Sequence, residues 1–317
     1  MRRIGLPFSV SVALAFIGLV GGGFTDVSLE RIPEQRGDYP VLEADFHAHT
    51  RFSDGLLSPI DVVIHARRRG LHALAITEHN QVLPGHIARA FSSWIDGPII
   101  LPGQEVTSDR FHIIAIGVDR YVHWDQPPSA VISEIHGQGG VAIAAHPVRS
   151  YWPVFNEVLA ELDGSEVMHP LAFSDEAAEE GRRSPWVWSD LRDFYQQARS
   201  EGHSLAAIGS SDYHFFGPIG ICRTLVFTED VSAEGILDAI RQGRTVVFDL
   251  EGQPYGDSEL IALLAEAPYD WQPIDYNYGS TTPLDRVTRT MAWFGLIGAL
   301  TFRRRSLLVP DGADETA

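Results

Sequence analysis

Short apolar runs alternate with helix-like periodic segments through the middle of the chain, from about residue 41 to residue 250. The runs at 73–76 and 141–144 are almost wholly apolar, which is typical of strands buried on both faces of a parallel sheet. The pattern predicts strands at 41–46, 73–77, 98–102, 112–118, 141–145, 165–168, 206–210 and 224–228. It predicts helices at 59–69, 129–138, 155–162, 187–201 and 233–242. Repeated strand-helix units indicate an α/β fold, and at this length a closed or partly closed barrel.

An uncharged stretch of 21 residues, 4–24, follows Arg2 and Arg3 at the start of the chain. It is longer than the apolar core of a typical signal peptide and long enough to cross a bilayer. We interpret residues 1–25 as a signal peptide or a membrane anchor, with a buried core helix as the alternative. Because no clean A-x-A cleavage signal follows, cleavage and retention both stay open.

A second uncharged run, of 13 residues at 290–302, lies near the other end and is followed by three arginines. Such a cluster is typical of the cytoplasmic side of a membrane segment. We interpret 290–305 as a membrane anchor or sorting tail, or alternatively as an amphipathic or core helix. Residues 251–289 are interpreted as a linker and 306–317 as a disordered tail. The two ends together predict an exported protein, in the periplasm or attached to the outer side of the cytoplasmic membrane.

The net charge and the cysteine content exclude several classes of function. The formal net charge is −18, and all basic residues are arginines because the sequence contains no lysine. Binding of a polyanion requires a basic surface, so we expect no nucleic-acid partner. Cys222 is the only cysteine, which excludes an intramolecular disulfide and a thiolate-based zinc site. Any metal ion must therefore be held by nitrogen and oxygen atoms.

Side chains that can bind metal follow five of the predicted strands, at the end where function gathers in α/β barrels. These residues are His47, His49, His79, Glu105, His146, Asp212 and His214. One histidine in such a place is more often a hydrogen-bonded core residue than a ligand, but five strand ends with such groups favour a metal site. The histidines interpreted as surface or structural are His65, His72, His86, His123, His136, His169 and His203.

Five segments resemble, in order and spacing, the motifs of the PHP (polymerase and histidinol phosphatase) superfamily. They are DFHAHTRFSDG, AITEHN, GQEVTSDRFH, AAHP and SSDYH, and the resemblance covers about residues 43–250. It implies a distorted (βα)7 barrel that holds up to three metal ions. The chain has Glu78 where the family more often has Asp. The segment that begins at Ile221 also resembles the CehA/McbA-like metallohydrolases, which implies hydrolysis of carboxylic or carbamic esters as an alternative.

The resemblance also implies how the ligands divide among the ions. One ion would be bound by His47, His49, Glu105 and Asp212, a second by Glu105, His112 and His146, and a third by Asp54, His79 and His214. The expected cofactors are two or three divalent ions, with Mn, Zn or Fe as candidates and Mg as a further one. Within this set we interpret Glu105, Asp54 and His214 as the catalytic residues.

Glu105 is the candidate for a carboxylate that bridges two ions, because its two oxygens can span the gap and its charge offsets the repulsion between the ions. A hydroxide between the ions would then attack the substrate. Arg149 is a candidate for gripping a phosphate oxygen, with a plain surface arginine as the alternative. Glu166 is a candidate for orienting a ligand or a water molecule, with a salt bridge as the alternative.

The sequence thus predicts a metal-dependent phosphoesterase that acts on a small phosphorylated molecule. The first alternative is a carboxyl or carbamate ester hydrolase that uses the same site. The second is a non-catalytic metal-binding PHP module at the membrane, which the complete set of ligand positions disfavours.

Overall fold

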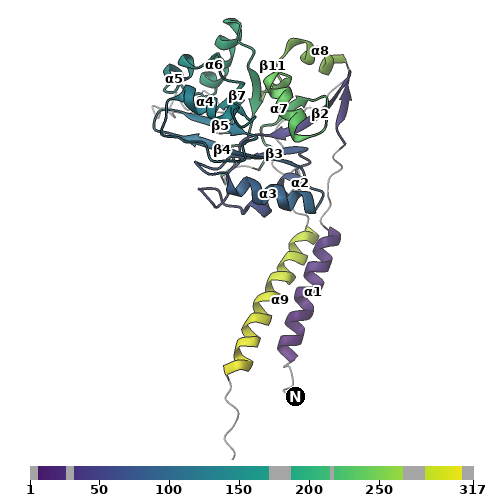
Figure 1. Cartoon of the computed structure of the whole chain (residues 1–317). Coiled ribbons are helices and arrows are strands. Elements are labelled where there is room, and N and C mark those ends of the chain that lie inside the picture. The colour runs from purple at the N-terminus through teal and green to yellow at the C-terminus, as the bar shows by residue number, and fades with distance from the viewer. Residues whose placement is uncertain (1–5, 26–31, 171–186, 215–217, 267–282, 309–317) are drawn as a thin grey trace, which may run out of the picture. The chain divides into compact units, whose positions relative to one another are not determined.

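The computed structural model describes residues 6–25, 32–170, 187–214, 218–266 and 283–308 (Figure 1). The terminal helices α1 and α9 form one compact unit, and the chain between them forms a second. The strands are β1 (Glu34–Arg36), β2 (Tyr39–Asp45), β3 (Ala73–Ile76), β4 (Ile99–Thr107), β5 (His112–Ile116), β6 (Val141–Ala144), β7 (Gly164–Met168), β8 (Ala206–Gly209), β9 (Thr224–Phe227), β10 (Thr245–Phe248) and β11 (Pro254–Gly256). The helices are α1 (Leu6–Thr25), α2 (Pro59–Arg68), α3 (Leu83–Trp94), α4 (Pro128–His136), α5 (Trp152–Glu157), α6 (Trp188–Ser200), α7 (Ala233–Arg241), α8 (Ser258–Glu266) and α9 (Pro283–Leu308).

The strands of the larger unit form one sheet that curves into a nearly closed barrel. Their order is β11-β10-β9-β2-β3-β4-β5-β6-β7-β8, with β1 paired to β2 outside this path. Between β8 and β9 the Thr224 hydroxyl lies 2.9 Å from both the backbone nitrogen and the carbonyl oxygen of Gly209, which links β8 across the remaining gap. The predicted α/β barrel is thereby confirmed in its general form.

The sheet contains both parallel and antiparallel pairs, whereas the apolar runs in the sequence predicted a parallel sheet. β2, β3 and β4 pair in parallel, as do β6, β7 and β8, but β5 is antiparallel to both of its neighbours. Residues 108–111 are the whole connection between β4 and β5, and so short a connection permits only an antiparallel hairpin. The reversal places the first residue of β5, His112, at the rim where the parallel strands end.

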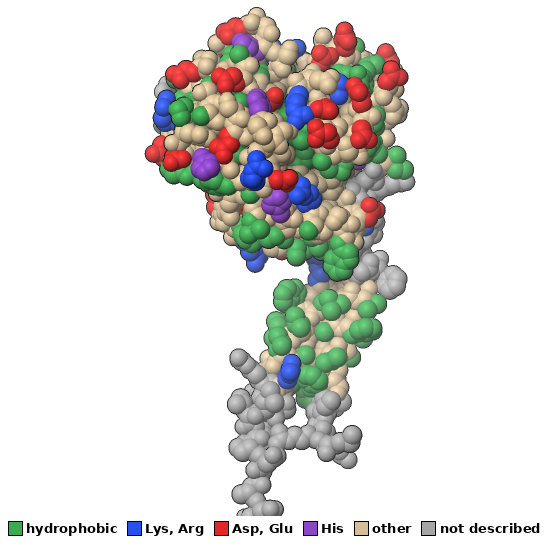
Figure 2. All heavy atoms as spheres, viewed as in Figure 1, with side chains coloured by type: hydrophobic (Ala, Val, Ile, Leu, Met, Phe, Trp, Pro, Cys, Tyr) green, Lys and Arg blue, Asp and Glu red, His purple; other side chains and the backbone are tan. Residues whose placement is uncertain are grey.

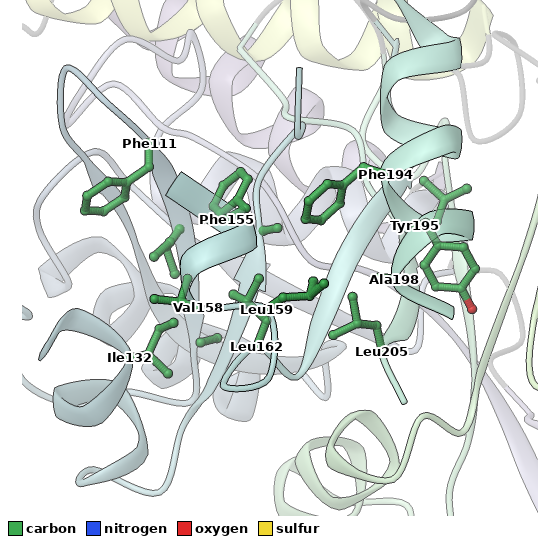
Figure 3. Packing of buried hydrophobic residues seen from close by; sticks show 14 of the residues in the cluster. Phe111, Ile132, Phe155, Val158, Leu159, Leu162, Phe194, Tyr195, Ala198 and Leu205 are labelled. Atoms are coloured by element: carbon green, nitrogen blue, oxygen red, sulfur yellow. The ribbon is translucent and has the colours of Figure 1, made fainter. Parts of the chain in front are cut away.

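Alternation along the strands divides the apolar side chains between two large clusters. In β5, Ile114 and Ile116 belong to a cluster that α7 covers through Ile236 and Ile240. The intervening Ile113 belongs to the other cluster, which lies under α4, α5 and α6. Figure 3 shows part of this second cluster, with the rings of Phe111, Phe155 and Phe194. Burial on both faces explains why the strand sequences are nearly continuous runs of apolar residues.

The sequence pattern missed some elements and displaced another. Helix α3 was not predicted; Pro84 occupies its first turn, where proline is tolerated. Helix α5 covers 152–157, whereas the prediction was 155–162. Strands β1, β10 and β11 were also not predicted.

The predicted linker at 251–289 is wrong in its first part. Strand β11 pairs with β10, and α8 buries Leu260 and Leu264 against Val41 and Phe227. The folded region therefore continues to residue 266, past the predicted end at 250. Residues 267–282 lie outside the described residues, and α9 already begins at Pro283.

The terminal unit is an antiparallel pair of helices. Gly18 of α1 lies against Thr288 and Ala292 of α9, and Gly295 of α9 lies against Ser11 and Ala15 of α1. Among the helices in the described ranges, none is both long enough and apolar enough to cross a membrane. Helix α9 extends to Leu308, so the predicted disordered tail begins in a helix, and its residues 309–317 lie outside the described part of the chain.

Candidate metal centre

The structure brings together the nine residues predicted to bind metal. The loop after β2 carries His47, His49 and Asp54; β3 to β5 contribute His79, Glu105 and His112; the segments after β6 and β8 contribute His146, Asp212 and His214. His79 and Glu105 are further joined by an isolated bridge beyond the end of β3. The side chains form overlapping groups whose ligand atoms lie within 4.8 Å of one another.

The first group is centred on two histidine nitrogens. The Nε2 atoms of His47 and His49 lie 3.0 Å apart, and Asp212 Oδ1 lies 3.2 and 3.1 Å from them. Glu105 Oε2 lies 3.4 and 3.3 Å from the same two nitrogens. Two nitrogens and two carboxylate oxygens thus converge on one point, an arrangement suited to one divalent cation.

The second group shares Glu105 with the first. The other oxygen of this carboxylate, Oε1, lies 2.6 Å from His112 Nδ1 and 3.1 Å from His146 Nε2. Each oxygen of Glu105 therefore faces a different set of imidazoles. A carboxylate in this position can bridge two cations, which is the role predicted for it.

The third group lies nearer to solvent. Asp54 Oδ2 is 3.4 Å from His79 Nε2 and 3.2 Å from His214 Nε2, and Asp54 Oδ1 is 3.7 Å from His49 Nδ1. Asp54 is 54% exposed, whereas His49 is buried. The group faces the open side of the cluster, where a substrate can approach.

The buried residue Glu166, which is not one of the nine, holds the first group in place. Glu166 Oε1 lies 3.0 Å from His47 Nδ1, and it also accepts a hydrogen bond from the Ser210 hydroxyl. The other oxygen of Glu166 accepts a hydrogen bond of 2.5 Å from the backbone N–H of His146. A proton on His47 Nδ1 leaves the lone pair of Nε2 for a metal ion. The structure therefore supports the orienting role predicted for Glu166.

His169 corrects the sequence interpretation, which had placed it away from the rim. It is fully buried, and its Nε2 lies 2.9 Å from Asp212 Oδ2. It comes directly after the last residue of β7, so the same strand-end pattern that singled out the other histidines could have identified it.

Glu78 clamps the loop that carries Asp54. The buried Glu78 accepts hydrogen bonds from the backbone N–H of Thr50, at 2.7 Å, and from the Ser53 hydroxyl. Both donors lie between the His-x-His pair and Asp54. Glu78 thus fixes the chain next to the third group.

Backbone strain is concentrated at the same rim. Asn80, His146 and Asp212 have φ angles of 50°, 26° and 42°, in a region that side chains other than glycine seldom adopt. Such conformations cost free energy and persist where the surrounding structure imposes them, often at functional sites. Here the strained backbone belongs to two predicted ligands, His146 and Asp212.

Opposite charges couple the buried groups strongly. Burial would raise the pKa of Glu105, but the charge of His47 and hydrogen bonds from His112 and His146 hold that pKa well below its usual range. Burial likewise opposes ionisation of Asp212, yet His47 and His169 hold its pKa well below the usual range. For His49, burial lowers the pKa, but Asp212 and Glu105 raise it to about 9. The cluster thus holds buried carboxylates in their anionic, metal-binding form.

The residues present fit divalent metal ions. Glu105 Oε2 and Asp212 Oδ1 are buried and, within the described part of the chain, no contact to them has the geometry of a hydrogen bond, although imidazole nitrogens lie within 3.4 Å of both. Buried carboxylate oxygens without donors are costly unless a cation balances them. Because the donors are imidazoles and carboxylates, the set suits divalent ions that accept nitrogen and oxygen ligands.

Arg149 has partners outside this cluster. Its side chain is 61% exposed, with Nε 3.4 Å from Asp190 Oδ1 and the guanidinium carbon 3.8 Å from the centre of the Trp152 ring. Its contact with substrate therefore stays a prediction, and the structure agrees with the alternative of a surface arginine held by an ion pair and a cation–π contact.

We expect Glu166→Gln to weaken metal binding by about 10- to 100-fold, because the substitution removes the charge that fixes the ring and tautomer of His47. Titration with Mn or Zn would measure this effect. Glu134→Gln is the matched control. Glu134 lies on helix α4, away from the cluster, and its carboxylate pairs with His123. Equal affinities for the two variants would show that Glu166 does not tune the site.

Two family models match the sequence of this chain. The model of the PHP domain matches residues 45–210, just over half of the chain, and that of a PHP-associated segment matches residues 198–245. The chain belongs to the PHP family. The second match contains Asp212 and His214, so both matched regions of this PHP protein contribute to the cluster. Family and ligand set together support a metal-dependent hydrolase.

Three matched proteins have low sequence identity to this chain. The chain is 26% identical over 141 residues to an uncharacterised protein of Methanocaldococcus jannaschii, an alignment that covers 40% of this chain and 82% of that protein. A two-domain protein of Bacteroides vulgatus that contains a predicted PHP-like metal-dependent phosphoesterase has a TM-score of 0.59 and 21% identity, over 76% of this chain and 74% of that one. An amidohydrolase of Chromobacterium violaceum has a TM-score of 0.42 and 20% identity, over 56% of this chain and 89% of the other. The likeness to the Bacteroides vulgatus protein shows a shared fold.

Proposed function

We propose that this PHP protein is a metal-dependent phosphoesterase that hydrolyses a small phosphorylated molecule. The observation that carries the proposal is the position of Glu105, whose two oxygens face two separate groups of imidazoles. A pair of cations joined by a carboxylate is a recurrent arrangement for in-line displacement at phosphorus. The Bacteroides vulgatus protein, which contains a predicted phosphoesterase of the same fold, agrees with this class of reaction.

The residues divide the work as follows. His47, His49 and Asp212 would hold one cation, His112 and His146 a second, and Glu105 both; Asp54, His79 and His214 would hold a third. When bound, two or three such ions would supply positive charge for an anionic ester and lower the pKa of a water molecule. His214 Nδ1 lies 2.8 Å from the carbonyl oxygen of Asp212, so its proton belongs there and Nε2 is left to face Asp54. Glu105, Asp54 and His214 remain our catalytic residues.

A substrate panel would test the proposal. Purified protein would be reconstituted with Mn, Zn, Fe or Mg and assayed on phosphomonoesters, phosphodiesters, carboxyl esters and carbamates. We expect turnover of at least one class of small phosphate ester. The proposal fails if the reconstituted protein hydrolyses none of them while it turns over a carboxyl ester or a carbamate.

That second outcome corresponds to the competing proposal, a carboxyl or carbamate ester hydrolase. The specific observation in its favour is that Arg149, the predicted phosphate-binding cation, is engaged by Asp190 and Trp152. Arg149→Ala therefore discriminates between the candidates. A loss confined to phosphate esters would place the arginine on the phosphate, whereas changes below about threefold on all substrates would leave it at the surface.

We also propose that the enzyme acts outside the cytoplasm, in the periplasm or on the outer side of the membrane. The uncharged terminal stretches flanked by arginines support this location. An alkaline phosphatase fusion after Val247 should be active and a cytoplasmic reporter at the same point silent. The opposite pair of results would exclude the location.

A further inference from the structure

The helix pair α1/α9 presents large apolar side chains to its surroundings. On α1, Phe16 is 66% exposed and Leu19 is 69% exposed; on α9, Phe294 is 69% exposed. Figure 2 shows hydrophobic side chains spread over the face of the pair that is in view. The other exposed large apolar residues of the pair are Val10, Val12, Ile17, Val20, Leu284, Val287, Trp293, Leu296, Ile297 and Leu300. So much exposed apolar surface on two helices requires a cover.

The two helices already bury their small residues against each other. A Cβ atom added at Gly18 would lie 2.3 Å from the backbone nitrogen of Ala292, and one added at Gly295 would lie 2.1 Å from that of Ala15. Close backbone approach over glycines is how helices associate where the surrounding medium offers no hydrophobic driving force. The bulky residues are left to point outwards, which is the reverse of the arrangement in a water-soluble pair.

The polar groups of the pair are also suited to an apolar medium. The hydroxyls of Ser11, Thr288, Thr290 and Thr301 each donate to the carbonyl oxygen four residues earlier in their own helix. Thr290 and Thr301 do so although they are exposed. Between Arg289 and Arg303, α9 carries no charge over 13 residues. Groups that satisfy their hydrogen bonds within the helix can be placed in lipid at low cost.

We infer that α1 and α9 act as one unit that is embedded in the apolar layer of a lipid membrane. The exposed apolar residues run along most of the length of both helices, from Val10 to Val20 on α1 and from Leu284 to Leu300 on α9. A lipid layer would cover all of them at once. The uncharged part of α9 is about 20 Å long, against about 30 Å for a hydrocarbon layer. The inference is contact with lipid along the pair, and it is independent of the reaction that the barrel catalyses.

Flotation of the full chain with vesicles of phosphatidylcholine and phosphatidylglycerol tests this inference. The wild type should float, and Phe16→Ser/Leu19→Ser/Phe294→Ser should partition at least about 100-fold less, because three large apolar contacts with lipid are lost. The matched control is Trp94→Ser/Trp124→Ser/Val231→Ser, three exposed apolar residues of the barrel unit, which should float like the wild type. A wild type that stays below the vesicles as a discrete soluble oligomer, or a terminal variant that floats as well as the wild type, would overturn the inference.

A crosslink tests whether the helices stay paired in lipid. A Cβ atom added at Gly298 would lie 3.1 Å from the Cβ atom of Ser11, so Ser11→Cys/Gly298→Cys should form a disulfide within one chain on oxidation in vesicles. Cys222 is buried and would be replaced by serine to avoid side reactions. Val12→Cys/Gly298→Cys is the control, because Val12 is 44% exposed and faces away from the seam. No crosslink in the first variant, or equal crosslinking in both, would show that the pair does not persist.

Discussion

Glu105→Gln should reduce kcat at least about 100-fold, because it removes a buried charge that lies between the two groups of imidazoles while almost preserving the shape of the side chain. Glu105 is 1% exposed, and each of its oxygens faces a different group of histidines. An amide can offer one oxygen and one N–H₂ group, so it cannot accept a cation on both sides. Steady-state kinetics of the reconstituted variant, together with its metal content, would measure the effect.

His136→Gln is the control for this experiment. Its Nε2 lies 2.8 Å from Asp163 Oδ2, and the Asp163 carboxylate, by hydrogen bonding, raises the pKa of this histidine, so His136 is a perturbed histidine outside the cluster. We expect kcat within about twofold of the wild type. If Glu105→Gln were as active as His136→Gln, the bridging role and the proposed chemistry would both be wrong.

Removal of metal should abolish activity and lower the melting temperature by roughly 8–16 °C. A ligand that is present at 1,000 times its Kd stabilises the folded state by about 4 kcal/mol, and a domain of this size gains about 2–4 °C per kcal/mol. The buried carboxylates of Glu105 and Asp212 lose their counter-charge when the ions leave. Dialysis against a chelator, followed by thermal unfolding and by addition of Mn or Zn, would measure the loss and its recovery.

Asp54→Ala makes the metal experiment specific to one group. Asp54 contacts His79 and His214 but neither His112 nor His146 within the described interactions. We expect metal analysis to show loss mainly of the ion held by the third group. A variant that loses all its metal would contradict the division into groups. A wild type that is fully active after complete metal removal would contradict the metal dependence itself.

The tertiary structure explains two site residues that sequence patterns interpreted incompletely. Glu166 and His169 both lie on or directly after β7, and the structure places them against His47 and Asp212 respectively. Their position near a strand end was visible in the sequence. Which ligand each of them contacts depends on the neighbouring strands β6 and β8, and therefore on the order of the sheet.

The sequence alone determined the class of fold, and it predicted the candidate ligands from strand ends and, for Asp54 and His112, from the resemblance to PHP motifs. Doubly apolar runs mark strands buried on two faces, and metal-binding side chains stand where those strands stop. Only the tertiary structure decided that Glu105 faces two groups, that His112 reaches the rim through the reversed strand β5, and that Arg149 is held by Asp190. These relations join residues that are distant in sequence, and the closing of the sheet, together with side-chain packing, decides which of them meet.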